Sequence, residues 1–456
     1  MKKKVIIIAP AGASANVFKN FMHLPLLGPF YLGTILEQAG FEVVIYNEYN
    51  VEDEIPLHYA HFDFLLLSLI TPTLERGHKI ASNFRKINPK IKIIIGGIHP
   101  TLHPDESLEF ADIVVKGEAE EIIVDLLKND LNLNERIITT KHLTDLDKIP
   151  IPNFNLMHSK ELLKIYPIIT SRGCPHDCSF CSVSKTFGRK YRVANVNKII
   201  EEISTTVRQN QIFFYDDNFT ADKDRVKYLL HQMLLKNIKK EWIAQTRIDI
   251  ADDDELLSLM KRSGCKKIYL GLESISNQVL KEYKKSQTIE DIEEGLKKIH
   301  AAGIAVHGMF IFGSDSDTPQ IFKKTVEFCK KNKIETSQYL ALTPFPGTQI
   351  YQEMEKSNRV LHKKWSYYDT IHVVFKPKSL SALDLQNNII SSFEEFYSCS
   401  NIIKEFILSI IRFKKFDISS FNIHKSALKI INEWKKNNLQ YLKLLENKTE
   451  KEEMIS

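Results

Sequence analysis

The sequence predicts an α/β protein: an N-terminal doubly wound, Rossmann-like domain, then a partial (β/α)6 barrel, then a helical C-terminal tail. Short strands rich in valine and isoleucine alternate with helical stretches over the first ~140 residues, which is typical of a parallel sheet. A second series of six strand–helix units extends from Ile165 to about Phe375. The 456 residues are too many for one simple core.

The first series has five buried strands separated by helices. We expect the strands at Val5–Ala9, Glu42–Tyr46, Phe64–Leu69, Ile91–Ile95 and Ile113–Val115. We expect helices at Leu26–Ala39, Glu75–Arg85 and Ala119–Leu127. Ligands of such sheets bind beyond the carboxyl ends of the strands, and small or turn-forming residues follow these ends. The absence of a G-x-G-x-x-G motif argues against a dinucleotide ligand.

A polar connector with two prolines, Pro150 and Pro152, separates the two series. We therefore expect a Rossmann-like domain at 1–140, a linker at 141–160, the barrel at 161–378 and a helical region at 379–456. The barrel strands are expected at Tyr166–Thr170, Ile212–Tyr215, Trp242–Thr246, Lys267–Leu270, Ala305–Phe312 and Gln338–Leu342.

Three cysteines follow the first barrel strand. Cys174, Cys178 and Cys181 have the spacing C-x3-C-x2-C, and Phe180 precedes the last of them. Three thiolates on one loop can hold three irons of a 4Fe–4S cubane and leave the fourth iron open for a ligand. The loop is expected on the carboxyl-terminal rim of the barrel, where chemistry gathers in such folds.

Two other interpretations of the triad are a zinc site and a disulfide framework. Zinc prefers four ligands, and His176 lies too close in sequence to complete a tetrahedral site with this triad. Disulfides prefer small, cysteine-dense chains, whereas this chain has six cysteines in 456 residues. We therefore favour the cluster, and expect the other cysteines to behave as buried apolar residues.

Charge and hydropathy limit the partners. The net charge of +5 is mild and the basic residues do not form one stripe, so we expect no nucleic-acid partner. No uninterrupted apolar stretch reaches the ~18 residues of a membrane span. A reduced, cytoplasmic location suits an oxygen-sensitive cluster. The segment Ile402–Phe416 reads as a helix packed on the barrel, or alternatively as a helix in peripheral contact with a membrane surface.

The cysteine loop and its place after a barrel's first strand resemble the radical S-adenosylmethionine (radical SAM) superfamily. The preceding doubly wound domain and the Leu-Asp-x-x-Pro-x-Pro linker are similar to its cobalamin-binding branch. Within that branch the chain is most similar to the group of anaerobic magnesium-protoporphyrin monomethyl ester cyclase and the hopanoid-modifying enzymes. The resemblance covers residues ~1 to 380.

This resemblance implies three cofactors: a 4Fe–4S cluster on the cysteines, S-adenosylmethionine on the open iron, and cobalamin in the first domain. One electron from the cluster would cleave S-adenosylmethionine to methionine and a 5′-deoxyadenosyl radical, which abstracts a hydrogen atom. A reductase such as ferredoxin or flavodoxin would supply the electron. The substrate would be a small, hydrophobic molecule, and Trp365, Tyr367 and Tyr368 could line its site or belong to the core.

The resemblance also assigns roles at the ends of the barrel strands. The methionine amino group would lie near Asp216, Asp217 and Asn218, although Asp217 or Asn218 could instead cap a helix. Gln245 and Arg247 end the third strand, and Arg247 would pair with the methionine carboxylate or make a surface ion pair. Glu273, beside Ser274, would bind ribose hydroxyls or form a structural pair.

The expected cobalamin wall consists of small residues that allow close approach of the backbone. These residues are Ser68, Thr71, Gly96, Gly97 and Gly117. The cobalt-ligating motif D-x-H-x-x-G of many cobalamin proteins is absent. His99 or His103 could approach cobalt, but capping of a loop is the stronger interpretation.

Three functions are compatible with these residues. The first is a cobalamin-dependent radical enzyme that methylates or oxidatively cyclises at an unactivated carbon. The second is a radical SAM enzyme without cobalamin, whose first domain binds substrate or a partner. The third is an iron–sulfur regulator, which would not cleave S-adenosylmethionine. We favour the first.

Overall fold

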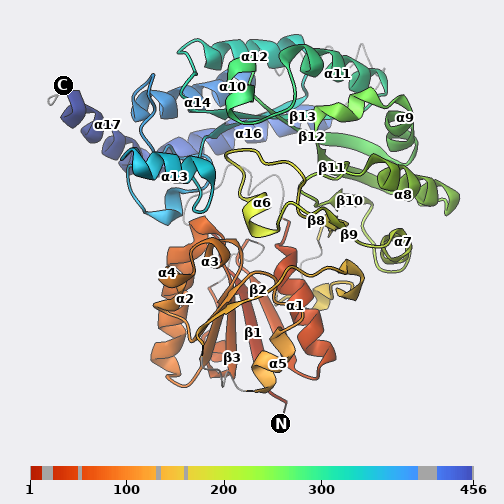
Figure 1. The fold of residues 1–456 in the computed structure, drawn as a ribbon, viewed down its shortest axis with the longest axis vertical. Coiled ribbons are helices and arrows are strands. Elements are labelled where there is room, and N and C mark those ends of the chain that lie inside the picture. Colours follow the sequence, from red (N-terminus) through yellow and green to blue (C-terminus); the bar gives the residue numbers. More distant parts are fainter. Residues whose placement is uncertain are drawn as a thin grey trace.

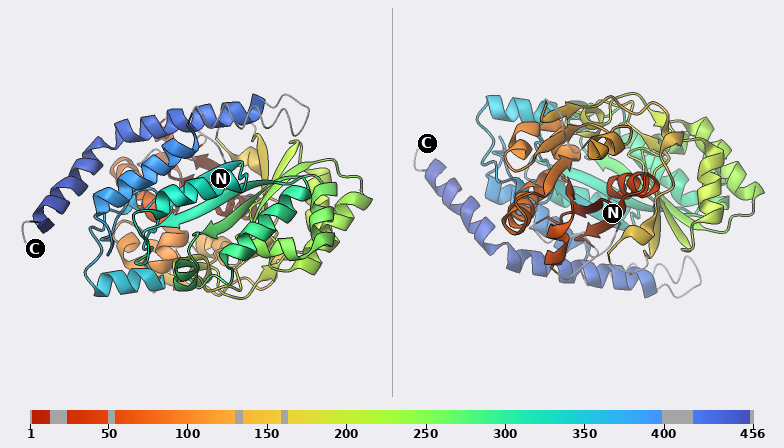
Figure 2. Two further views of the ribbon diagram at one scale, coloured as in Figure 1. Left: turned by 90° about the horizontal axis from the view of Figure 1, so that it is seen from above. Right: turned by 90° about the horizontal axis from the view of Figure 1, so that it is seen from below.

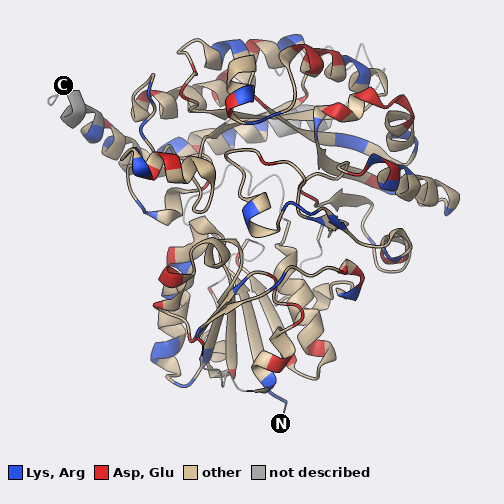
Figure 3. Ribbon diagram, viewed as in Figure 1, with Lys and Arg blue, Asp and Glu red and all other residues tan. Residues whose placement is uncertain are grey.

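The computed structural model describes residues 2–12, 24–49, 54–129, 135–158, 163–398 and 418–453. An N-terminal α/β domain lies below a larger open barrel, and the short helix α6 (Val183–Thr186) lies at their junction (Figure 1). Acidic and basic residues are interspersed over the helices of both parts in this view (Figure 3).

The N-terminal sheet has six parallel strands in the order β2-β1-β3-β4-β5-β6. They are β1 (Lys4–Ala9), β2 (Glu42–Asn47), β3 (Phe64–Ser68), β4 (Lys92–Gly96), β5 (Ile113–Lys116) and β6 (Ile137–Thr139). The five predicted strands are confirmed. Sequence inspection did not predict β6, because this three-residue edge strand is only half-buried and lies in a polar stretch.

Helices cover both faces of this sheet (Figure 1). They are α1 (Leu27–Gln38), α2 (Leu74–Ile87), α3 (Ile98–Leu102), α4 (Pro104–Leu108) and α5 (Ile123–Lys128). Alternate residues of β1 enter different cores: Ile6 and Ile8 pack on one face, and Val5 and Ile7 on the other. Burial on both faces explains why these strands read as continuous apolar runs.

The strand order places a topological switch point beside β1. Strand β1 pairs with β2 on one side and with β3 on the other, both in parallel. The connections therefore leave β1 and β3 in opposite directions, and a crevice opens beyond their carboxyl ends. This geometry positions the cavity described below.

The barrel is a six-stranded parallel sheet in the order β14-β13-β12-β11-β10-β7. Its strands are β7 (Ile165–Ile168), β10 (Gln211–Phe214), β11 (Glu241–Thr246), β12 (Cys265–Glu273), β13 (Ala305–Phe312) and β14 (Thr336–Ala341). All six predicted strands are confirmed. Since β7 and β14 are both edge strands of this sheet, the barrel is open, as predicted.

Amphipathic helices follow the barrel strands and bury one side against them. They are α7 (Val196–Thr205), α8 (Lys223–Leu235), α9 (Asp254–Arg262), α10 (Asn277–Glu282), α11 (Ile289–Ala301), α12 (Ile321–Lys331) and α13 (Gln349–Lys356). Side-chain caps fix several helix starts: Asp222, Asp253 and Thr288 each accept a hydrogen bond from a backbone amide of the first turn.

The connector between the two sheets packs against both of them. The backbone amide of Asn153 donates to the Thr34 hydroxyl at 2.8 Å, and Met157 forms a bridge with Ile45 of β2. On the barrel side, the Lys198 ammonium donates to the carbonyls of Leu146 and Asp147 at 3.2 and 2.8 Å. The described part of the connector therefore contacts both domains, and the boundaries at 140 and 160 remain predictions.

The C-terminal region contains α14 (Ala382–Phe396), α16 (Ile418–Asn437) and α17 (Leu439–Glu453). Helices α16 and α17 follow one another along the outside of the molecule and contact α14 (Figure 2). The predicted helix Ile402–Phe416 lies outside the described residues. Among the described helices, none combines the length and apolarity that a membrane span requires.

We predict that Gly97→Ala lowers the free energy of unfolding by about 3 kcal/mol. Gly97 has φ +111°, and an added Cβ would lie 2.5 Å from the Leu69 carbonyl oxygen. Urea denaturation followed by circular dichroism measures the change. Gly28→Ala is the matched control, because no atom lies within 4 Å of its added Cβ. Equal losses in the two variants would contradict this account of Gly97.

Candidate functional site

A short antiparallel hairpin closes the base of the cysteine loop. Strand β8 (Ser171–Arg172) pairs with β9 (Arg192–Val193). Gly173 follows β8 with φ +84°, and an added Cβ would lie 2.6 Å from the Lys190 carbonyl oxygen. Any residue other than glycine at this position would therefore clash with the backbone at the base of the loop.

The three predicted cluster cysteines share this loop and are half-buried, free thiols. Phe180 packs edge-on against Tyr283 at 5.2 Å, and the backbone amide of Ser179 donates to the Tyr283 carbonyl at 3.3 Å. These contacts fix the middle of the loop against the barrel. Burial raises the pKa of Cys181 to about 12 and raises that of Cys174, so binding of a metal group must displace protons.

The donor set fits a site-differentiated cubane. The loop supplies three thiols, and each cysteine of a cubane binds a different iron, so the donors need not converge on one point. Within the described residues, no three His, Cys, Asp or Glu side chains lie close enough together to hold a single metal ion.

The adjacent carboxylates Asp216 and Asp217 follow β10 but face different surroundings. Asp216 is 1 % exposed and accepts from the Thr170 amide at 2.9 Å and the Ser171 hydroxyl at 2.5 Å. It therefore joins the ends of β7 and β10. Asp217 is exposed at the edge of the cavity, and desolvation by the surrounding protein, followed by the charge of Asp216, raises its pKa to about 7. Of these two carboxylates, only Asp217 lines the cavity and can contact a ligand there.

The other predicted residues of this rim divide in the same way. Asn218 is buried in the turn after β10, where its side-chain oxygen accepts from the Thr220 hydroxyl at 3.4 Å. Gln245 at the end of β11 lines the cavity. Arg247 is buried beside the cysteine loop, and its positive charge acts on Cys174 and His176. A buried guanidinium at this position suits a carboxylate ligand.

Glu273 ends β12 in a strained conformation. Its φ is +62°, and the register between β12 and β13 shifts between Gly271 and Glu273. Its carboxylate pairs with the Lys285 ammonium at 2.7 Å, and both side chains are buried. Ser274 is also buried, and its hydroxyl accepts from the Ser276 amide at 3.1 Å. The structural pair considered for Glu273 is therefore present. The positive φ of Glu273 is a strained backbone conformation, which the surrounding structure must stabilise.

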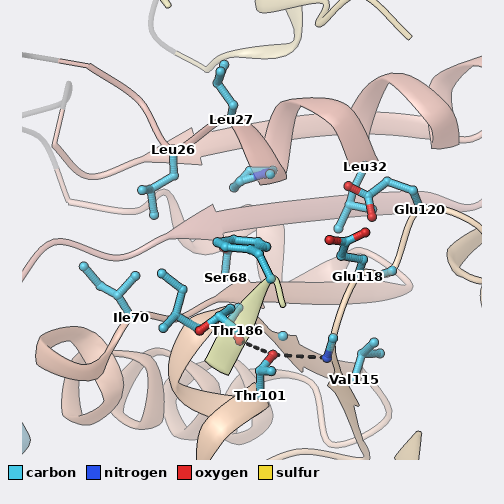
Figure 4. A pocket seen from close by; sticks show the side chains of 18 of the residues that line it. Leu26, Leu27, Leu32, Ser68, Ile70, Thr101, Val115, Glu118, Glu120 and Thr186 are labelled. Atoms are coloured by element: carbon cyan, nitrogen blue, oxygen red, sulfur yellow. Dashed lines mark hydrogen bonds between the residues drawn. The ribbon is translucent and has the colours of Figure 1, made fainter. Parts of the chain in front are cut away.

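A cavity of about 340 Å³ lies between the N-terminal sheet and the barrel. It is bordered by the carboxyl ends of β3, β4 and β5 on one side and by residues that follow β7 and β10 on the other. Most of its wall is apolar, and Figure 4 shows Leu26, Leu27, Leu32 and Ile70 around it. Four of the predicted cobalamin-wall residues line it: Ser68, Gly96, Gly97 and Gly117. Asp217 and Gln245 complete the barrel side.

Thr101 of α3 holds two of the glycine turns in this wall. Its hydroxyl donates to the Gly97 carbonyl at 2.7 Å and accepts from the Gly117 amide at 3.1 Å (Figure 4). Both glycines have φ +111°. The wall can therefore present bare backbone to a large flat ligand, which fits a corrin. Sequence inspection missed Thr101, because its partners are set by the packing of α3 between β4 and β5.

The predicted residues Thr71 and His99 lie behind the wall. Both are buried, and the Thr71 hydroxyl lies 3.3 Å from Nδ1 of His99. Burial, followed by the charge of His103, lowers the pKa of His99 to about 4. The ring packs edge-on to Trp365 at 5.3 Å. The expected role of His99 in capping a loop stays a prediction. Its ring packs against Thr71 and Trp365, and the cavity-lining residues of the described chain include no histidine.

The aromatic residues considered for a substrate site belong to the core. Trp365 and Tyr368 are buried in the same cluster as the N-terminal sheet, and Trp365 Nε1 donates to Glu106 at 2.6 Å. Neither they nor Tyr367 line the cavity. They attach the barrel's last segment to the N-terminal domain.

Four charged residues near the cavity were not predicted. Glu118 and Glu120 come from the loop after β5, and Arg172 and Arg192 from the hairpin below the cysteines. Sequence inspection could not pair them, because Glu118 and Arg192 are 74 residues apart.

Two family models match separate parts of the chain. The B12 binding domain family matches residues 17–127, and the radical SAM superfamily matches residues 168–329. The bacteriochlorophyllide d C-12(1)-methyltransferase of Chlorobaculum tepidum is 29 % identical over 421 residues, which cover 88 % of this chain and 89 % of the relative. The anaerobic magnesium-protoporphyrin IX monomethyl ester cyclase of Cereibacter sphaeroides is 26 % identical, with 80 % and 66 % covered.

A solved structure shares the whole architecture. The cobalamin-dependent S-adenosylmethionine radical enzyme OxsB with aqua-cobalamin bound superposes with a TM-score of 0.68. The superposition covers 98 % of this chain and 81 % of that one at 15 % identity. At this identity the likeness concerns the fold, and it confirms the predicted order of Rossmann-like domain, barrel and helical tail.

We predict that Thr101→Val lowers the free energy of unfolding by about 1–3 kcal/mol, because two backbone groups lose their partner without a change in side-chain shape. Faster hydrogen exchange at the Gly117 amide would report the same loss locally. Thr101→Ser keeps the hydroxyl and serves as the control. If valine and serine give the same exchange rate at Gly117, the hydroxyl does not hold this turn.

Proposed function

We propose that this chain, which matches the radical SAM superfamily and the B12 binding domain family, methylates or oxidatively cyclises an unactivated carbon with the help of cobalamin. One observation carries the proposal: a single cavity touches both halves. The glycine turns of the N-terminal sheet form one wall, and Asp217, which acts electrostatically on Cys174 and Cys181, forms part of the other.

The chemistry comes from the bound groups, and the protein supplies their positions. When bound, a 4Fe–4S cluster supplies the electron that cleaves S-adenosylmethionine reductively, and cobalamin supplies a carrier for a methyl group or an electron. Cys174, Cys178 and Cys181 would hold the cluster on the loop. The three cysteines are half-buried, and Thr186 and Phe187 of the same loop line the cavity.

Two charged residues would orient S-adenosylmethionine. Asp217 would accept hydrogen bonds from its ammonium group, and Arg247 would pair with its carboxylate. Both side chains lie beside the cysteine loop. Asp216 would act indirectly, because its hydrogen bonds to Thr170 and Ser171 fix the rim from which Asp217 projects. Glu273 would reach ribose hydroxyls only by sharing its carboxylate with Lys285.

Ser68, Gly96, Gly97 and Gly117 would contact cobalamin through small side chains and bare backbone. Since no histidine of the described chain lines the cavity, this wall offers no imidazole to cobalt. Thr71 and His99 would support the wall from behind.

The substrate would be a hydrophobic small molecule, such as a tetrapyrrole. Two relatives carry names of enzymes acting on bacteriochlorophyllide d and on magnesium-protoporphyrin IX monomethyl ester. The predominantly apolar cavity of this chain supports the same class. A ferredoxin or flavodoxin would supply electrons, as radical SAM chemistry requires a reductant.

The second candidate function omits cobalamin. The N-terminal domain would then bind substrate directly in the same cavity, and the absence of histidine from its described wall favours this alternative. The spectrum of the purified protein separates the two functions.

We predict that Cys178→Ala abolishes both the electron paramagnetic resonance signal of the reduced cluster and the formation of 5′-deoxyadenosine. Two thiolates cannot retain the cubane in its site. Cys265→Ala is the control, because this buried cysteine lies at the start of β12, away from the loop. Retention of either signal in Cys178→Ala would show that the triad does not hold the cluster.

We predict that protein purified anaerobically from cells grown with cobalamin carries near-stoichiometric corrin, visible in its absorption spectrum. Ser68→Phe should weaken hydroxocobalamin binding at least tenfold, since the ring would fill the cavity next to the glycine wall. Ser204→Phe, on the exposed side of α7, is the control. Wild-type protein without corrin after reconstitution would favour the second candidate function.

A further inference from the structure

The hairpin below the cysteine loop places two arginines directly opposite each other. In the β8–β9 pair, Arg172 is the register partner of Arg192. Their side chains are only 8 % and 3 % exposed. Like charges opposite one another on antiparallel strands destabilise the pair, and burial removes the water that would screen them. The hairpin therefore needs counter-charges to close.

The N-terminal domain supplies these counter-charges. Both oxygens of Glu118 accept from Arg192, at 2.8 and 2.7 Å, and Glu120 accepts from Arg172 at 2.6 Å. Glu118 also lies 3.6 Å from Arg172. Two buried carboxylates thus neutralise two buried guanidinium groups across the boundary between the domains. We call these four residues the interdomain charge cluster.

Arg192 also fixes the backbone of the connector and of the cysteine loop. It donates to the Leu143 carbonyl at 2.6 Å and to the Phe187 carbonyl at 2.9 Å. The Leu143 amide in turn donates to Glu118 at 2.7 Å. Burial favours the neutral acid, yet the hydrogen bonds from Arg192 and the charge of Arg172 hold the pKa of Glu118 below its usual value. The carboxylate is therefore charged, as the cluster requires.

The interdomain charge cluster borders the cavity assigned to cobalamin. Glu118, Glu120 and Arg172 are lining residues, together with Gly117 on one side and Phe187 on the other. In Figure 4, Glu118 and Glu120 lie next to one another at one end of the cavity. A ligand that fills the cavity would lie against Glu118, Glu120 and Arg172 and cover the small part of Arg172 and Glu120 that is still exposed, 8 % and 9 % of their side chains.

We propose that the interdomain charge cluster couples the two cofactor sites, so that a filled corrin cavity stabilises the iron–sulfur loop, and the loaded loop raises the affinity of the cavity for cobalamin. The proposal rests on the cobalamin function proposed above. The four residues act as positioning residues, since they fix the hairpin from which the cysteines project. By thermodynamic linkage, the cluster and cobalamin must raise each other's binding affinity by the same factor.

The test measures hydroxocobalamin binding to the full-length protein by absorbance titration, with and without the reconstituted cluster. For wild type we expect cluster loading to raise the affinity about tenfold, within the range of typical couplings. In Glu118→Gln the ratio of the two affinities should fall to about one. The rate of iron loss to a chelator gives the reverse measurement: corrin should slow it in wild type and leave it unchanged in the variant.

Further variants exclude a simple folding defect. Glu118→Gln leaves Arg192 buried without its counter-charge, which can unfold the protein. The double variant Glu118→Gln, Arg192→Met removes that unpaired charge and should bind both cofactors without coupling. Glu118→Asp keeps the charge at shorter reach and should retain part of the coupling. Arg85→Gln is the control, because its pair with Asp112 at 3.0 Å lies within the N-terminal domain.

The outcomes separate the two proposals. Wild-type coupling in Glu118→Gln or in the double variant would overturn this inference, and so would a wild-type ratio of one. Loss of coupling in both variants, with coupling kept in Arg85→Gln, would support it. Wild-type protein that binds no hydroxocobalamin would instead overturn the cobalamin function itself.

Discussion

The carboxyl ends of two parallel sheets meet at one cavity, and the rest of the structure follows from this constraint. Each sheet gathers its loops at the carboxyl ends of its strands, because every strand runs in the same direction. The connector fixes how the two edges meet, through Thr34 and Ile45 on one side and Lys198 on the other. Glycine turns from one sheet and the cysteine loop from the other thereby come to border one space.

The fold could be read from the sequence because burial on both faces leaves a local signature. Strands such as β3 and β4 each contain a run of three or four apolar residues, so each could be predicted without knowing which strands lie beside it. Strand β6 has no such apolar run, because it lies at the sheet edge with two half-buried residues and one exposed residue, and it was therefore not predicted. The cysteine triad was readable for a different reason: its three donors lie within one loop.

Site residues were predictable only as far as their partners lie close in sequence. The sequence placed Asp216 and Asp217 together on the rim but could not separate them. Successive residues at the end of a strand point in opposite directions, so one meets the β7 end and the other the cavity. His99 follows the glycine turn as expected, yet helix α3 directs its ring behind the wall.

The interdomain charge cluster could not be predicted from the sequence, because its partners lie in different domains. Arg172, next to Gly173 in the cysteine motif, looks like one more exposed rim residue, and Arg192 lies beyond the loop in a polar stretch. Burial of an unpaired guanidinium group is strongly destabilising. These two arginines can be buried because Glu118 and Glu120 of the N-terminal domain pair with them. The N-terminal domain contributes the two carboxylates of this cluster, and the barrel contributes the two guanidinium groups. A barrel of this sequence without its N-terminal domain would carry two uncompensated arginines beneath the loop that holds its cluster.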